Sequence, residues 1–137
     1  LPAALELLAR ETNDAGSTRV ELHVAGEAVA LPEEIKTALF RVTQEALANV
    51  AKHARAHVVQ VALSFDADGV SLDIRDDGCG FELERVQLDP NRGIGLRNMR
   101  ERLESIGGSF EVRSAPGAGT ALHAKVPPEA IRRLGAG

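Results

Sequence analysis

The sequence predicts a two-layer α+β sandwich, in which a mixed, mostly antiparallel sheet packs against helices on one of its faces. Three observations lead to this fold class. Segments of alternating apolar and polar residues come in pairs joined by glycine-containing turns, as antiparallel hairpins do. Two longer segments repeat their apolar residues at helical spacing. The 137 residues, 44% of them hydrophobic, are enough for one domain with a core.

The first half of the chain is expected to hold a short helix, a strand and a long helix. Residues 5–10 read as a helix that the polar and glycine residues of 13–16 end. Residues 19–24 alternate as a strand does. The long helix, 33–53, follows Leu31-Pro32 and has two acids in its first turn. Its apolar stripe consists of Ile35, Leu39, Val42, Ala46 and Val50.

The second half is expected to hold two hairpins with a helix between them. Strands 58–65 and 69–75 are joined by an Asp-Ala-Asp-Gly turn, and strands 109–114 and 120–126 by a turn rich in glycine. Residues 82–92 have acids, a proline and little periodicity, which predicts a mobile loop. A helix led by Gly93 follows and stops at Gly107. Its apolar positions are Leu96, Met99, Leu103 and Ile106.

Composition narrows the class of protein. A net charge of -4 argues against a nucleic-acid surface, and no stretch approaches the roughly 18 apolar residues of a membrane span. The single cysteine, Cys79, favours a reducing compartment such as the cytoplasm. Because the chain begins with Leu1, we expect a piece cut from a longer protein. We predict one domain over 1–137, with a core of about 5–127 and a frayed tail at 128–137.

The most informative stretch is Asp76-Asp77-Gly78-Cys79-Gly80, which follows an alternating strand. The strand delivers a carboxylate into a glycine turn, where glycines let a ligand approach the backbone. A carboxylate accepts hydrogen bonds and cannot donate them, so it suits the amino group of an adenine better than a phosphate. The alternative is an ordinary Asp-Gly hairpin turn.

A second motif, Gly93-Ile94-Gly95-Leu96, precedes the later helix. A Gly-x-Gly that opens a helix exposes backbone N–H groups at the positive end of the helix dipole, which favours phosphate. It is not a Rossmann motif, because Asn98 stands where the third glycine belongs, and no Walker Gly-Lys-Ser/Thr follows. The alternative is a hinge and helix cap.

A third motif lies on the long helix. Glu45 and Asn49 are four residues apart and share a face that borders the apolar stripe, with Lys52 and His53 one turn further on. A carboxamide oxygen is a reasonable Mg²⁺ ligand, and a neighbouring carboxylate can orient water or take a proton. The alternative is a solvated helix edge.

Along the chain, the helix motif that begins with Glu45 comes first, the glycine turn after Asp76 second and the Gly93 motif third. A fourth motif, Gly119-Thr120, follows them. Together they resemble the ATP-binding boxes of the superfamily that contains DNA gyrase, the ninety-kilodalton chaperones, histidine kinases and mismatch-repair ATPases. The resemblance implies the Bergerat-type ATP-binding fold. Segments 41–49, 95–103 and 106–108 are similar to sensor histidine kinases of the nitrate-sensor type, which pair with helix-turn-helix response regulators. The resemblance runs from about Leu5 to Pro127.

The resemblance implies a role for each matching residue at the base. Asp76 would accept from the adenine amino group, and Thr120 would bond near the adenine. Gly78 and Gly80 would let the backbone close over the base. Phe81, which follows this turn, is expected in the core.

It also implies roles at the phosphates. Asn49 would ligate Mg²⁺, and Glu45 would be the acid, base or water-orienting group. Lys52 or His53 would contact phosphate, and Arg97 and Arg100 remain open for that role. Gly93 and Gly95, in the same box as Leu96, would hinge residues 82–92 as a lid.

The function implied is binding of Mg-ATP and donation of its γ-phosphate to a histidine on a separate dimerisation domain, with a response regulator downstream. None of the four histidines here sits in such a helix pair, so we expect half an enzyme. No nucleic acid and no direct membrane contact are expected. Two alternatives stay open, a serine kinase that switches off an anti-sigma partner and a nucleotide-gated interaction module without phosphotransfer.

Overall fold

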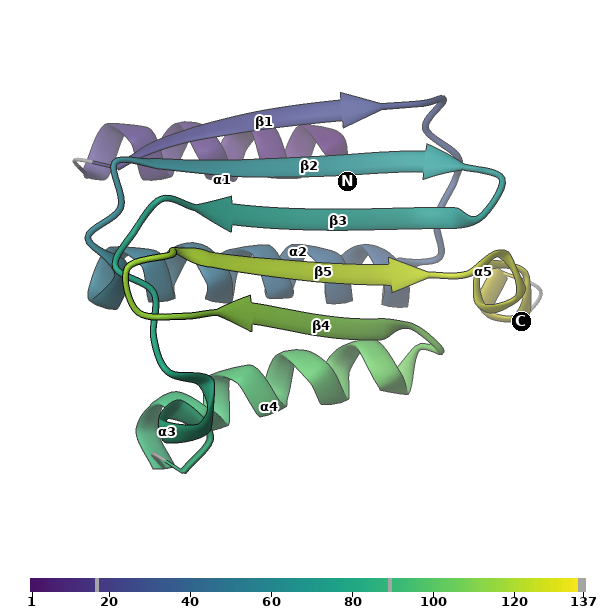
Figure 1. Ribbon diagram of the computed structural model, residues 1–137. Helices are drawn as coiled ribbons and strands as arrows, with labels where there is room; N and C mark the ends of the chain where they lie inside the picture. The colour runs from purple at the N-terminus through teal and green to yellow at the C-terminus, as the bar shows by residue number, and fades with distance from the viewer. Residues whose placement is uncertain (17, 89, 136–137) are drawn as a thin grey trace.

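The computed structural model describes residues 1–16, 18–88 and 90–135. It has two layers, a sheet and a set of helices beneath one of its faces (Figure 1). The described sheet has five strands in the order β1-β2-β3-β5-β4, with β1 parallel to β2 and the other neighbours antiparallel. The strands are β1 (Arg19–Ala25), β2 (Val58–Asp66), β3 (Gly69–Asp76), β4 (Ser109–Ser114) and β5 (Thr120–Val126).

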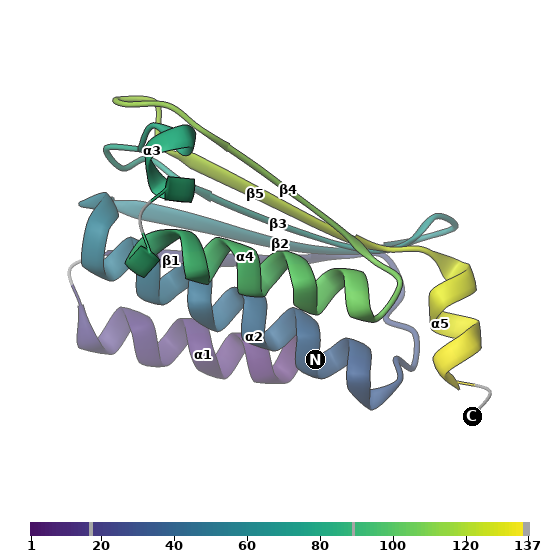
Figure 2. The ribbon, with the colours of Figure 1, turned by 90° about the horizontal axis from the view of Figure 1, so that it is seen from below.

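The helical layer is formed by segments from both halves of the chain. Figure 2 shows α1, α2 and α4 beneath one face of the sheet, with α5 at the end of the layers. The α+β sandwich with a mixed, mostly antiparallel sheet is thereby confirmed. The helical elements are α1 (Pro2–Ala15), α2 (Glu33–Asn49), the π-helical turn η1 (Val50–Ala54), α3 (Leu83–Leu88), α4 (Pro90–Ser105) and α5 (Pro128–Gly135).

The core lies between the sheet and the helices. Every residue of the stripe expected on the long helix is buried, and so are Met99, Leu103 and Ile106 of α4. The inward-facing residues of β2 and β3 alternate with exposed or half-buried ones, as their period of two predicts. None of the described helices is both long and apolar enough to cross a bilayer.

The N-terminal helix is longer than predicted. It runs to Ala15, past the polar residues expected to end it. Asn13 accounts for this, because its side chain accepts a hydrogen bond from Val20 N at 2.6 Å and donates one to Val20 O at 3.1 Å. A residue that disfavours helices locally is thus occupied by a tertiary contact with β1.

The prediction of a loop over 82–92 was wrong for residues 83–88 and 90–92, and residue 89 lies outside the described part of the chain. Residues 83–88 form α3, and α4 begins at Pro90, a favoured first helical residue. Val86 of α3 is buried. A six-residue helix is too short to leave a clear periodicity in the sequence.

The prediction of a frayed tail was also wrong for residues 128–135, and residues 136–137 lie outside the described part of the chain. Residues 128–135 form α5, which starts with Pro128 and has Glu129 in its first turn, both favourable at a helix start. Ala130 is buried, and Ile131 and Leu134 pack against the core. The apolar face of α5 therefore extends the core.

Candidate functional site

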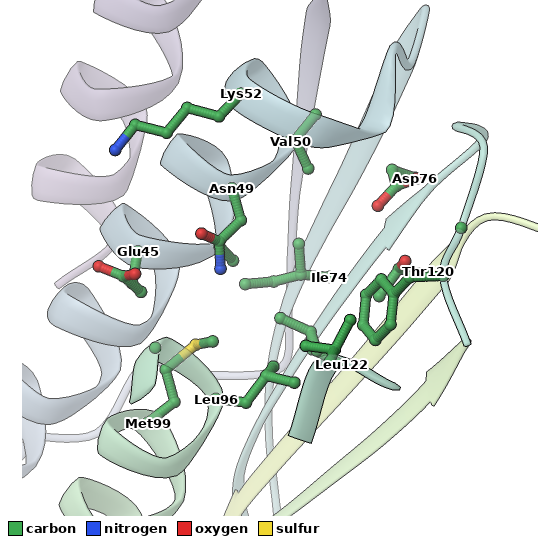
Figure 3. A pocket seen from close by; sticks show the side chains of 15 residues that line it. Glu45, Asn49, Val50, Lys52, Ile74, Asp76, Leu96, Met99, Thr120 and Leu122 are labelled. Carbon is green, nitrogen blue, oxygen red and sulfur yellow. The ribbon is translucent and has the colours of Figure 1, made fainter. Parts of the chain in front are cut away.

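A cleft opens between α2, the β3 and β5 ends of the sheet, and the α3–α4 segment (Figure 3). It brings together residues from all of the sequence motifs. The α2 and η1 side contributes Glu45, Ala46, Asn49, Val50 and Lys52. The sheet and its turn contribute Ile74, Asp76, Gly80, Phe81, Thr120 and Leu122, and the α3–α4 segment Val86, Gly95, Leu96 and Met99.

Polar side chains lie at the two ends of this cleft with apolar ones between them. Figure 3 shows Asp76 and Thr120 at one end, and Glu45 and Lys52 at the other with Asn49 pointing inward. The apolar wall between the ends is made by Val50, Ile74, Leu96, Met99 and Leu122. Such a cleft fits an elongated ligand that has a flat apolar middle and polar ends.

Asp76 is half-buried at the end of β3, where its Oδ1 accepts a hydrogen bond from Gly78 N at 2.8 Å. Burial raises the pKa of the Asp76 carboxyl above its ordinary value. Hydrogen bonds from the backbone of Gly78 and of Thr120 act in the opposite direction. The group at this end of the cleft is therefore a desolvated acceptor.

The neighbouring acid, Asp77, has a different task. Its Oδ1 accepts hydrogen bonds from His57 N at 2.8 Å and Val58 N at 3.0 Å, and it does not line the cleft. The Val58 N–H holds the pKa of the exposed Asp77 carboxyl below its usual range, and the His57 N–H acts in the same sense. Asp77 therefore ties the end of β3 to the start of β2.

Glu45 and Asn49 meet α4 at Gly95. A Cβ at Gly95 would lie 3.0 Å from Glu45 Oε1 and 3.8 Å from Asn49 Nδ2. The absence of a side chain on Gly95 thus lets a carboxylate and a carboxamide reach the same part of the cleft. Among the described residues, no group of three or more histidine, cysteine or acidic side chains is placed to hold a metal ion.

The expectation that Gly93 and Gly95 open the helix was wrong. The helix α4 begins at Pro90, so both glycines lie inside it and neither is its first residue. Gly93 is buried and does not line the cleft. Gly95 contributes to the cleft through its small size.

Directly after Asn49, the long helix continues as the π-helical turn η1. Such a turn changes the direction of the side chains that follow it, and single π-turns are frequent at functional sites. Lys52, on η1, lines the cleft with Asn49. The His53 side chain lies outside the described part of the molecule.

The glycine turn after Asp76 packs against the β4–β5 turn. Gly80 has φ +64°, and a Cβ there would overlap the carbonyl oxygen of Ala115. Gly119 has φ +72°, and a Cβ there would overlap the carbonyl oxygen of Asp76. Gly117 N donates to Cys79 O at 2.6 Å. These glycines let the two turns approach each other. Local sequence patterns do not predict this need for glycine, because the two turns are far apart in the sequence.

Gly78 and Phe81, from the glycine turn after Asp76, take different positions relative to the cleft. Gly78 is buried and does not line the cleft, and its N–H serves Asp76. Phe81, expected in the core, is a half-buried wall of the cleft instead. The position of Phe81 directly after the glycine turn was the one signal in the sequence for a place at the cleft. A single aromatic residue in a turn does not show whether it faces the core or a cleft.

Comparison with known proteins identifies the family of this chain. Residues 34–130 match the family model described as histidine kinase-, DNA gyrase B- and HSP90-like ATPase. The chain belongs to this ATPase family. The nitrate-sensor branch stays a prediction.

Two sensor histidine kinases are similar to this chain in sequence. The sensor histidine kinase MctS of Rhizobium johnstonii is 36% identical over 132 residues, 96% of this chain and 28% of that protein. LiaS of Bacillus subtilis, also a sensor histidine kinase, is 39% identical over 98 residues, 72% of this chain and 26% of LiaS. The chain spans less than a third of the length of these relatives.

The histidine kinase domain of the Erythrobacter litoralis EL346 blue-light activated histidine kinase has the same fold, with a TM-score of 0.77 at 24% identity. The match covers 98% of this chain and 64% of that one. The ATP binding domain of PrrB from Mycobacterium tuberculosis matches with a TM-score of 0.67 at 24% identity, over 89% of this chain and 91% of that one.

Proposed function

We propose that this chain is a single catalytic domain that binds Mg-ATP and donates the γ-phosphate to a histidine on a separate dimerisation domain of a two-component sensor kinase. A response regulator would then receive the phosphate, and ATP as substrate would place the domain in the cytoplasm. The observation that carries the proposal is that one cleft gathers Asp76 and Thr120 at one end and Glu45, Asn49 and Lys52 at the other.

The Asp76 end suits the base of ATP. A desolvated carboxylate that already accepts from the backbone has further lone pairs for an exocyclic amino group. The apolar wall beside it, with Phe81, Ile74 and Leu122, suits the faces of a purine. This arrangement supports Asp76 as the group that gives base specificity, with Thr120 beside it.

The Glu45 end suits the phosphates. Asn49 would hold Mg²⁺ through its carboxamide oxygen, a hard ligand, and Mg²⁺ commonly uses one or two protein ligands together with phosphate oxygens. The bound ion would neutralise phosphate charge. Glu45, which shares the Gly95 surface with Asn49, would act as the acid, base or water-orienting group. Lys52 would contact phosphate.

Arg97 and Arg100 of α4 are weaker candidates for phosphate binding than Lys52, which lines the cleft. The Arg100 guanidinium lies 5.9 Å from the centre of the Phe110 ring, a cation–π contact directed at the sheet. Arg97 is exposed, and neither residue lines the cleft. We therefore favour Lys52 as the cation at this end.

The test is transfer of labelled γ-phosphate from ATP to a separately supplied, histidine-bearing dimerisation domain. We expect label that is stable to alkali and labile to acid, because phosphohistidine has this stability and phosphoserine has the opposite one. Asn49→Ala is the matched inactive control. Alkali-labile label on a protein serine would favour the serine kinase. ATP binding without any transfer would favour the nucleotide-gated module. The names of the curated relatives favour the histidine kinase.

A further inference from the structure

We propose that Ser114 is a positioning residue for recognition of the base. Its hydroxyl oxygen accepts a hydrogen bond from the Thr120 hydroxyl, so that the Thr120 oxygen faces the cleft only as a hydrogen-bond acceptor beside Asp76. Ser114 was not among the residues that the sequence motifs indicated. The inference rests on the proposed function, since it concerns the base end of the same cleft.

The three residues form a row across the sheet. Ser114, the last residue of β4, is the register partner of Thr120, and Thr120 is in turn the register partner of Asp76. All three are half-buried. The row therefore leads from Ser114, which does not line the cleft, through Thr120 to the carboxylate that does.

The hydroxyl of Ser114 has three close partners. It accepts a hydrogen bond from Phe81 N at 2.9 Å. Its oxygen lies 3.0 Å from the carbonyl oxygen of Gly119 and 3.0 Å from Thr120 Oγ1. It thus joins the turn after Asp76, the β4–β5 turn and the Thr120 side chain at one point.

Counting protons settles the direction of each bond. A hydroxyl carries one proton and two acceptor lone pairs. The Gly119 carbonyl can only accept, so Ser114 donates its proton to Gly119. Ser114 then has only lone pairs left, and the bond to Thr120 forms when Thr120 donates. This is the one assignment that satisfies all three contacts together. The Thr120 oxygen keeps only acceptor capacity for the cleft.

Two acceptors at this end favour a particular purine edge. A 6-aminopurine presents an amino donor at C6 beside the N1 acceptor, whereas a 6-oxopurine presents a carbonyl acceptor at C6 beside an N1–H donor. In our proposal Asp76 and Thr120 both face the group at C6. The 6-oxo group would face the Asp76 carboxylate and a Thr120 oxygen with no proton to offer. Sites built from buried polar groups discriminate strongly against a ligand that leaves those groups unpaired. Ser114 therefore strengthens the preference for ATP over inosine triphosphate (ITP).

The test is the ratio of the Kd for ITP to the Kd for ATP, measured by calorimetry with Mg²⁺ on the whole chain. In Ser114→Ala the Thr120 proton is released and can be donated to a 6-oxo group. We expect the ratio to fall about tenfold, the scale of one hydrogen bond. Ser114→Thr keeps the hydroxyl and should keep the ratio. Ser109→Ala, at the other end of the same strand, is the matched control and should change neither Kd.

A second variant separates positioning from a merely structural role. Thr120→Val removes the acceptor and leaves the bonds of Ser114 to Phe81 and Gly119 in place, so it should lower the same ratio even if Ser114→Ala does not fold. In the Thr120→Val background, Ser114→Ala should have no further effect on the ratio. Equal losses of ATP and ITP affinity in Ser114→Ala, or an unchanged ratio in Thr120→Val, would overturn the inference. A parent protein that binds neither nucleotide would instead refute the proposed function.

Discussion

Replacing Asp76 with asparagine tests the base end of the cleft most directly. The carboxylate accepts a hydrogen bond from the backbone N–H of Gly78 and, in our proposal, one from the amino group of adenine. An amide of the same shape has one acceptor oxygen and one NH₂ group. Whichever way the substituted amide turned, its NH₂ would face a donor, either on the backbone or on the base.

The size of the effect follows from the bond that is lost. A hydrogen bond to a charged group contributes about 1.5–3 kcal/mol, so ATP affinity should fall about 10- to 100-fold. Calorimetry with Mg-ATP measures this, and thermal unfolding shows whether the variant remains folded. Asp77→Asn is the matched control, because Asp77 is the adjacent acid and does not line the cleft.

Two results would refute this reasoning. A folded Asp76→Asn protein with the parent's ATP affinity would show that Asp76 does not read the base. A loss of affinity in Asp77→Asn as large as that in Asp76→Asn would mean that the effect comes from the turn and its backbone contacts, and not from the carboxylate in the cleft.

Four further changes test the rest of the site. Asn49→Ala should bind ATP without the enhancement that Mg²⁺ gives the parent, as a magnesium titration would show; equal enhancement in both proteins would exclude Asn49 as a ligand. Glu45→Gln should bind Mg-ATP within a few-fold of the parent while phosphotransfer falls about 10²-fold, the usual scale of acid–base help; joint loss of binding and rate would make it a binding residue. Gly95→Ala should gain up to about 1 kcal/mol of helix stability in chemical unfolding, yet slow phosphotransfer, because the new Cβ would lie 3.0 Å from Glu45 Oε1; a full rate would contradict a close contact. The pKa of the Asp77 carboxyl is lowered, so its contribution to the free energy of unfolding is present above its ordinary pKa of 3.8 and is lost as the pH falls through the folded-state pKa. Asp77→Asn should therefore reduce the loss of stability at acid pH, measured by chemical unfolding across pH, and an unchanged pH dependence would refute this.

The sequence by itself determined the layers and most element positions. Strand alternation and the helical stripe from Ile35 to Val50 are local patterns, and each places a buried face without reference to the rest of the chain. The order of the four motifs was likewise enough to indicate the ATPase family. The roles given to Asn49, Glu45 and Asp76 within that family stay predictions, although the structure brings all three to one cleft.

Only the tertiary structure decided features that depend on partners far away in the sequence. Asp76 and Asp77 are adjacent acids, and what separates them is that Asp77 meets backbone N–H groups 19 and 20 residues away. Asn13 ends no helix because Val20 occupies its side chain. Gly80 and Gly119 are needed where two turns meet. In each case a local preference is weak, about 1 kcal/mol or less, and one hydrogen bond or one close backbone contact outweighs it.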